Sequence, residues 1–143
     1  MKIVVDTNVL ISGIFWKGPP FEVLNLWKRK QIVLLVSPEI IDEYYKTATE
    51  IALKYKISNI DSILNSILSN SEICSSIPLP EQICEDLDDD KFIACALSGH
   101  AKFIVTGDKK LLKVSEYEDV KIIRPSDFVK RYFKGKNGKK KVK

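Results

Sequence analysis

The residues of this chain that could do chemistry are carboxylates placed where apolar runs end. Asp6 closes the run Ile3-Val4-Val5. A short run of β-branched residues is typical of a strand buried on both faces, as in a parallel sheet. Open α/β sheets place their ligand crevices outside the carboxyl ends of such strands. Asp6 is therefore predicted to face a ligand crevice.

Three more acids, Glu43, Asp89 and Asp108, fall at comparable strand-to-helix points. Asp108 follows the strand-like run 103–105, and Gly107 before it is expected to let the backbone turn sharply. Taken alone, each position is an ordinary turn or helix residue. Four carboxylates that converge on one crevice, however, need a positive counterion.

The segment from Glu85 to Asp90 holds five acids in six positions. One or two acids at a helix N-terminus contribute about 0.3–1 kcal/mol each. Further acids repel one another, by roughly 4 kcal/mol for two charges 4 Å apart at an effective dielectric near 20. The density of the run therefore indicates more than helix capping.

Oxygen donors without histidine or cysteine favour Mg²⁺ or Mn²⁺ over zinc. The lone histidine, His100, follows Gly99 at an expected helix end and is predicted to lie on the surface. The sequence holds no Ser-His-Asp arrangement and no glycine-rich nucleotide-binding motif. The remaining chemistry is metal-assisted attack on a phosphate, in which the ion activates water and stabilises the leaving oxygen.

The elements that must position these acids alternate between strands and helices. Strands are expected at 2–6, 31–36, 102–106 and 120–124, and 77–80 reads as a connector that could hold a short strand. Helices are expected at 21–30, 38–55, 58–68, 89–98 and 127–133, the second with Ser37 as N-cap and Pro38 as its first residue. The alternation predicts an α/β fold, a three-layer α/β/α sandwich with a mostly parallel central sheet.

The bulk composition is that of one globular domain. The chain has 143 residues, of which 45% are hydrophobic and 29% charged. No apolar stretch approaches the roughly 20 residues that span a bilayer, and no signal-peptide pattern is present, so no membrane association and a cytoplasmic location are expected. Cys74, Cys84 and Cys95 lack disulfide or zinc spacing and are expected to be reduced and structural.

The positive net charge comes from the end of the chain. Six of the 23 basic residues are lysines in 134–143, a segment without acids, so the 17 others face 19 acids and residues 1–133 carry about −2. We predict a domain at 1–133 and a disordered Lys/Gly-rich tail at 134–143. The tail is either weakly attracted to a phosphate backbone or simply solvated.

Four segments together resemble the successive motifs of PIN-domain ribonucleases, most closely the VapC-like toxin components of prokaryotic toxin–antitoxin pairs. The segments are Ile3–Ser12, Val36–Glu43, Asp88–Leu97 and Ile104–Asp108. The resemblance covers nearly the whole chain up to about Phe133. It implies an α/β/α sandwich whose acidic pocket binds Mg²⁺ or Mn²⁺ and cleaves RNA, homodimers, and inhibition by an antitoxin that occupies the pocket.

Carried over to this sequence, the resemblance makes Asp6, Glu43, Asp89 and Asp108 the catalytic acids. Asp6, Asp89 and Asp108 would hold the metal, and Glu43 would complete the shell or orient the attacking water. Asn8 and Thr106 would fix the positions of the carboxylates.

The position of the third acid of the motif is defined only to within one residue. Alignment on Ala94–Leu97 selects Asp89, but Asp90 stands where related sequences often have asparagine. Asp88 and Asp90 therefore remain alternates.

The leading interpretation is a divalent-metal-dependent endoribonuclease, acting as a toxin or in RNA processing. One alternative is a haloacid-dehalogenase-like phosphatase, which needs an aspartate where this chain has Asn8 and a lysine where it has Thr106. A second alternative is a non-catalytic module that binds RNA or a protein partner on the same fold.

Overall fold

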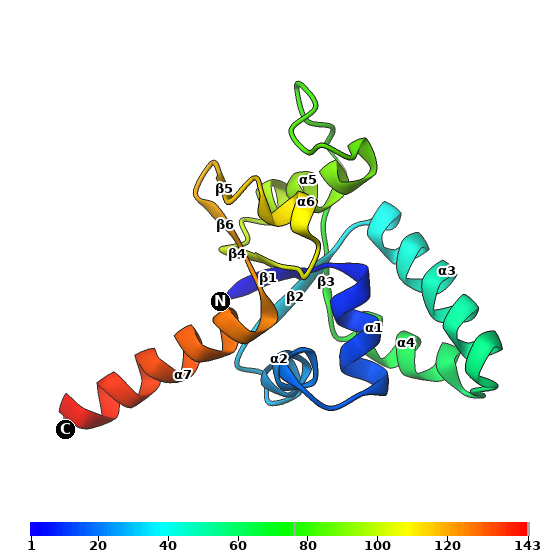
Figure 1. The fold of residues 1–143 in the computed structure, drawn as a ribbon, viewed down its shortest axis with the longest axis horizontal. Helices are drawn as coiled ribbons and strands as arrows, with labels where there is room; N and C mark the ends of the chain where they lie inside the picture. The colour runs from blue at the N-terminus through cyan, green and yellow to red at the C-terminus, as the bar shows by residue number, and fades with distance from the viewer. Residues whose placement is uncertain (76, 143) are drawn as a thin grey trace.

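A mostly parallel sheet forms the centre of the molecule (Figure 1). The structure is a computed structural model that describes residues 1–75 and 77–142, the last nine of them as backbone only. Within these residues the sheet has six strands in the order β3-β2-β1-β4-β6-β5. The strands are β1 (Lys2–Val5), β2 (Val33–Val36), β3 (Glu72–Ile73), β4 (Phe103–Val105), β5 (Glu116–Tyr117) and β6 (Val120–Ile123).

The strand order reverses at the centre of the sheet. β1 pairs in parallel with both β2 and β4, with Ile3 opposite Leu34 on one side and Phe103 on the other. Only β5 runs antiparallel, against β6. Ligands of open α/β sheets bind at such a reversal, outside the carboxyl ends of the strands. The point between β1 and β4 is therefore the place to look for a site.

Helices cover both faces of this sheet, which confirms the predicted three-layer arrangement. In Figure 1, α5 and α6 lie on one side of the strands and α1 and α2 on the other. The helices are α1 (Thr7–Phe15), α2 (Pro19–Lys28), α3 (Pro38–Tyr55), α4 (Ile60–Ser69), α5 (Asp90–Ser98), α6 (Lys109–Leu112) and α7 (Pro125–Val142), with a 3₁₀ turn, η1 (Leu87–Asp89), before α5. No described helix is both long and apolar enough to cross a membrane.

A local helix cap and a tertiary hydrogen bond together fix the position of α3 beside β1. Ser37 caps the helix by accepting a hydrogen bond from the Ile40 amide at 3.4 Å, and Pro38 follows as predicted. One turn later the buried Tyr44 hydroxyl donates to the carbonyl oxygen of Val5, the last residue of β1. This bond satisfies a buried strand-end carbonyl and brings the start of α3 against the end of β1.

Several elements differ from the sequence-based expectation, among them helix α6 and the turn η1, which were not predicted. Residues 7–15 form a helix that the apolar run did not reveal, because α1 has buried residues around most of its circumference and so lacks a helical stripe. The short third strand is β3, and residues 77–80 are only a connector. The hairpin strand β5 has two residues, too few to give an alternating pattern.

The last helix begins at Pro125 and continues past Phe133 to Val142. The predicted tail, residues 134–143, has side chains outside the described part of the structure. Its predicted disorder therefore stays a prediction.

The three cysteines are buried and free, in agreement with structural thiols. Burial raises the pKa of the Cys95 thiol to about 12, with a further contribution from Cys74. Such thiols are not ionised near neutral pH and are poor nucleophiles.

Gly99 ends α5 where the helix approaches the sheet closely. Its φ of −95° is ordinary, and the left-handed residue is the exposed His100, with φ of 58°. A Cβ on Gly99 would lie 2.5 Å from Leu35 Cδ1 and 2.4 Å from Cys74 Sγ. By contrast, Gly107 has no left-handed φ, and a Cβ there would meet no atom within 4 Å. The turn before Asp108 therefore does not use the conformational freedom of glycine that the sequence suggested.

Gly99→Ala is expected to destabilise the protein by about 1–3 kcal/mol, because the added methyl group overpacks a buried helix–sheet contact. Gly107→Ala serves as the matched control and is expected to change stability by less than about 0.5 kcal/mol. Urea unfolding of both variants measures the difference. Equal stability of the two variants would contradict the packing argument.

Candidate active site

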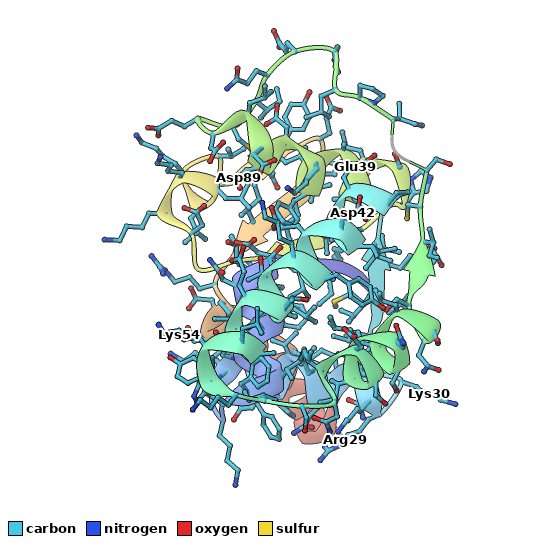
Figure 2. All side chains as sticks on the ribbon, turned by 90° about the vertical axis from the view of Figure 1, so that its right-hand side faces the viewer. Arg29, Lys30, Glu39, Asp42, Lys54 and Asp89 are labelled. Carbon is cyan, nitrogen blue, oxygen red and sulfur yellow. The ribbon has the colours of Figure 1, made fainter. Side chains whose placement is uncertain are left out.

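An acidic pocket of about 1010 Å³ opens at the carboxyl ends of β1 and β4. Nine of its lining residues are acids and two are lysines. The lining residues are Asp6, Thr7, Asn8, Glu39, Asp42, Glu43, Lys46, Thr47, Glu50, Asp86, Leu87, Asp88, Asp89, Lys91 and Asp108. Figure 2 shows Asp89 facing the part of α3 that carries Glu39 and Asp42. The pocket therefore joins acids from four separate segments of the chain.

Asp6 lies at the floor of the pocket and is only 7% exposed. Its backbone amide donates to the Val105 carbonyl at 2.9 Å, so the end of β1 is tied to β4. The buried Thr106 hydroxyl donates to Asp6 Oδ2 at 2.6 Å and accepts from the Asp108 amide at 3.0 Å. One hydroxyl thus fixes Asp6 and the backbone of Asp108 relative to each other.

Asp108 reaches the pocket from the turn after β4. One of its carboxylate oxygens caps α6 by accepting from the Lys110 amide at 3.0 Å. The cap holds the Asp108 carboxyl group near Asp89, and the charge of Asp108 raises the pKa of Asp89. Asp108 is therefore positioned by local hydrogen bonds at its own helix start.

The three consecutive aspartates at the start of α5 have different surroundings. Asp88 is exposed and pairs with Lys91 at 3.1 Å. Asp90 does not line this pocket and accepts from the amides of Ile83 and Cys84 at 3.1 and 2.7 Å. Asp89 lines the same pocket as Asp6 and Asp108 and lies near enough for their charges to raise its pKa. The geometry thus favours Asp89 as the third pocket acid over its two neighbours.

Glu43 belongs to α3 and forms part of the wall that this helix gives to the pocket. Oε2 accepts a hydrogen bond from the Thr7 hydroxyl, and Oε1 accepts from Lys91 Nζ at 2.5 Å. Both oxygens are therefore engaged by groups of this chain. Glu43 lies near enough to Asp6 to raise the pKa of that carboxyl.

Burial and neighbouring charges make Asp6 and Asp89 resist ionisation. Burial raises the pKa of Asp6 above its usual value, the Thr106 hydroxyl and the Thr7 amide oppose the shift, and Glu43 and Asp108 add to it. Burial followed by the charges of Asp108 and Asp6 raises the pKa of Asp89 to about 7. A cation among these groups would relieve the repulsion.

The donor set fits a hard divalent ion. Asp89 Oδ2 is buried and has no hydrogen-bond partner in the described structure. Such an orphaned oxygen needs a partner, and an ion bound between the acids would supply one. No three acid, histidine or cysteine side chains of the described residues enclose an ion as they stand. Mg²⁺ and Mn²⁺ suit such an open arrangement because Mg²⁺ in particular keeps several water ligands.

Sequence reasoning placed Asp6, Glu43, Asp89, Asp108 and Thr106 at a common site, and the fold brings all five together. Asn8 also lines the pocket but is exposed, and the hydroxyls that bond to the pocket acids are those of Thr7, on Glu43, and Thr106, on Asp6. Two contacting residues were missed, Thr7 and Lys91. Lys91 could have been found from its position three residues after Asp88, one turn along the helix.

Asp89→Asn is expected to stabilise the metal-free protein at pH 8 by about 1–2 kcal/mol, after allowance for solvent screening. The pKa of Asp89 rises from 3.8 to about 7 on folding, so the folded state holds this proton more tightly. The favourable contribution of that proton is complete below about pH 4 and is lost as the pH rises through about 7.

Urea unfolding in EDTA between pH 4 and 8 measures this gain, which should shrink towards pH 4. Asp42→Asn removes a charge from an exposed acid of the same pocket and is the control. A constant difference between Asp89→Asn and the wild type over the whole range would contradict the expected role of burial.

Asp90→Ala is expected to lower stability by about 1–3 kcal/mol, because two backbone amides lose a charged acceptor. Asp88→Ala removes an exposed ion pair and should cost less than about 1 kcal/mol. Unfolding of the two variants at one pH compares them. A larger loss for Asp88→Ala would show that the roles of these neighbours are misassigned.

Comparisons with known proteins agree with this geometry. The sequence matches the family model of the PIN domain over residues 2–110. A chain in the crystal structure of VapBC2 from Rickettsia felis bound to a DNA fragment from their promoter has a similar fold, with a TM-score of 0.57. The two chains share 15% identity over 85% of this chain and 97% of the other. No curated protein matches the sequence at a significant level.

The matched region contains β1, β2, β4 and every acid of the pocket. It covers more than half of the chain. The chain therefore belongs to the PIN domain family.

Proposed function

We propose that the chain is a divalent-metal-dependent endoribonuclease that hydrolyses RNA phosphodiester bonds with Mg²⁺ or Mn²⁺. The observation that carries the proposal is the convergence of Asp6, Asp89 and Asp108 around the buried, unpartnered Asp89 Oδ2. PIN domains are generally nucleases, and membership of the family supports hydrolase chemistry at this pocket.

Asp6, Asp89 and Asp108 would hold the ion, which when bound supplies activation of water and stabilisation of charge on the phosphate oxygens. Thr106 keeps Asp6 in place through its hydroxyl, and the Asp108 carboxyl is held by its own helix cap. These fixed carboxylates do not have to reorganise when an ion enters, which is the contribution expected of the protein around a metal.

Nine acids around one pocket also bear on the substrate. A phosphate backbone that approaches them is repelled unless cations lie between the two. RNA binding at this pocket should therefore depend on the same divalent ion as cleavage. The pocket is open, so a strand could cross it with one phosphate near Asp6 and Asp89.

The biological setting is proposed from the family and from the fold likeness to a VapBC2 chain. We propose a cytoplasmic toxin that forms homodimers and is inhibited by an antitoxin protein. Light scattering of the purified chain tests the dimer. Induced expression of the chain alone, which should arrest growth unless a partner is supplied, tests the toxin assignment.

Purified protein is expected to cleave RNA with Mn²⁺ or Mg²⁺ and to lose activity in EDTA. Asp6→Asn, Asp89→Asn and Asp108→Asn should each reduce the cleavage rate by about 100-fold or more, because each removes an ion ligand. Thr106→Val removes only a supporting hydroxyl and should cost about 10–100-fold. Cleavage of a labelled RNA oligonucleotide measures all four variants.

Asp42→Asn is the matched control, since Asp42 is an exposed acid of the same pocket. It should change the rate less than a few-fold. Full activity of Asp6→Asn and Asp89→Asn would refute the site assignment. Calorimetry that detects no Mn²⁺ binding to the folded protein would instead favour a non-catalytic binding module.

A further inference from the structure

Lys91 is a pocket residue to which the proposed chemistry gives no role. It lies in the first turn of α5, and its side chain is only 15% exposed. Its ammonium group donates to Glu43 Oε1 at 2.5 Å and to Asp88 Oδ2 at 3.1 Å. The ammonium therefore joins two acids that belong to different elements of the fold.

Five acids of the pocket fall into two groups by their partners. Glu43 and Asp88 share the ammonium of Lys91, and the second oxygen of Glu43 accepts from Thr7. The described lysines and arginines make no ion pair with Asp6, Asp89 or Asp108. One group thus has a cation from the chain itself, and the other has none.

We propose that Lys91 takes the place of a second divalent ion in this pocket. The inference rests on the proposed function, because it assigns one Mg²⁺ or Mn²⁺ to Asp6, Asp89 and Asp108. Lys91 is then a positioning residue: it neutralises Glu43 and holds its carboxylate away from the ion. An ammonium fixed to α5 is present at every metal concentration, whereas a second ion would have to be recruited from solution.

The number of Mn²⁺ ions bound without RNA tests the proposal. Titration calorimetry of the full chain should give one ion for the wild type and two for Lys91→Met, which removes the charge but keeps a side chain of similar length. Lys91→Arg keeps the charge and should remain at one ion. The double variant Lys91→Met/Glu43→Gln should return to one ion, because the second ion would lose its principal ligand.

Lys46→Met is the matched control, since Lys46 lines the same pocket from α3. It should leave the count at one. Two ions in the wild type would overturn the proposal whether or not Lys91→Met folds. A single ion in a folded Lys91→Met protein would overturn it as well.

RNA cleavage is assayed separately, so the two hypotheses can fail independently. A change from one ion to two without RNA cleavage by the wild type would support the role of Lys91 and refute the ribonuclease. Metal-dependent cleavage by the wild type with an unchanged ion count in Lys91→Met would support the ribonuclease and refute the role of Lys91. If neither the wild type nor Lys91→Met binds Mn²⁺, the inference about Lys91 is refuted.

Discussion

Repulsion between carboxylates at the ends of β1 and β4 is the constraint on which the arrangement of this site depends. The parallel pairing of the two strands places Asp6 and the Thr106–Asp108 turn side by side. Burial is the largest cause of the raised pKa values of Asp6 and Asp89, and the charges of neighbouring acids raise them further. Such a cluster persists only where other groups offset its charge. The hydrogen bonds and ion pairs around the pocket can all be understood as parts of that compensation.

Two kinds of compensation are visible. On the floor of the pocket, hydroxyl and amide donors stabilise Asp6 without adding charge. On the wall, Lys91 supplies a full positive charge to Glu43. Burial lowers the pKa of the lysine, but its hydrogen bonds to Glu43 and Asp88 raise it above the usual value overall. Asp89 Oδ2, by contrast, is buried without a hydrogen-bond partner among the described residues. That difference, more than the number of acids, locates the position for an external cation.

The fold alone would not justify a functional conclusion, because one architecture can host many activities. Nuclease chemistry is proposed from the site, where oxygen donors from separate segments meet at a strand-order reversal. Family membership adds the class of chemistry.

Neighbouring aspartates in one segment also serve different purposes here: Asp90 anchors the preceding loop, while Asp89 faces the pocket. In a tight helical turn, successive side chains point in directions about 100–120° apart, so Asp89 and Asp90 have different surroundings.

The sequence by itself determined the features that depend on neighbouring residues. These are the buried strand before Asp6, the Ser37–Pro38 start of α3, the alternation that gives an α/β fold, and the acids at strand ends. Such features follow from local backbone preference and from hydrophobic pattern.

The tertiary structure alone decided which groups meet. The bonds of Thr106 to Asp6, Lys91 to Glu43 and Thr7 to Glu43 join residues 100, 48 and 36 positions apart. Helix α1 has no visible period because tertiary packing buries most of its surface. The sequence favoured Asp89 by alignment but left Asp88 and Asp90 open, because the direction of each side chain depends on how α5 is rotated against the sheet. No local pattern encodes that rotation, which is set by packing against strands distant in the chain.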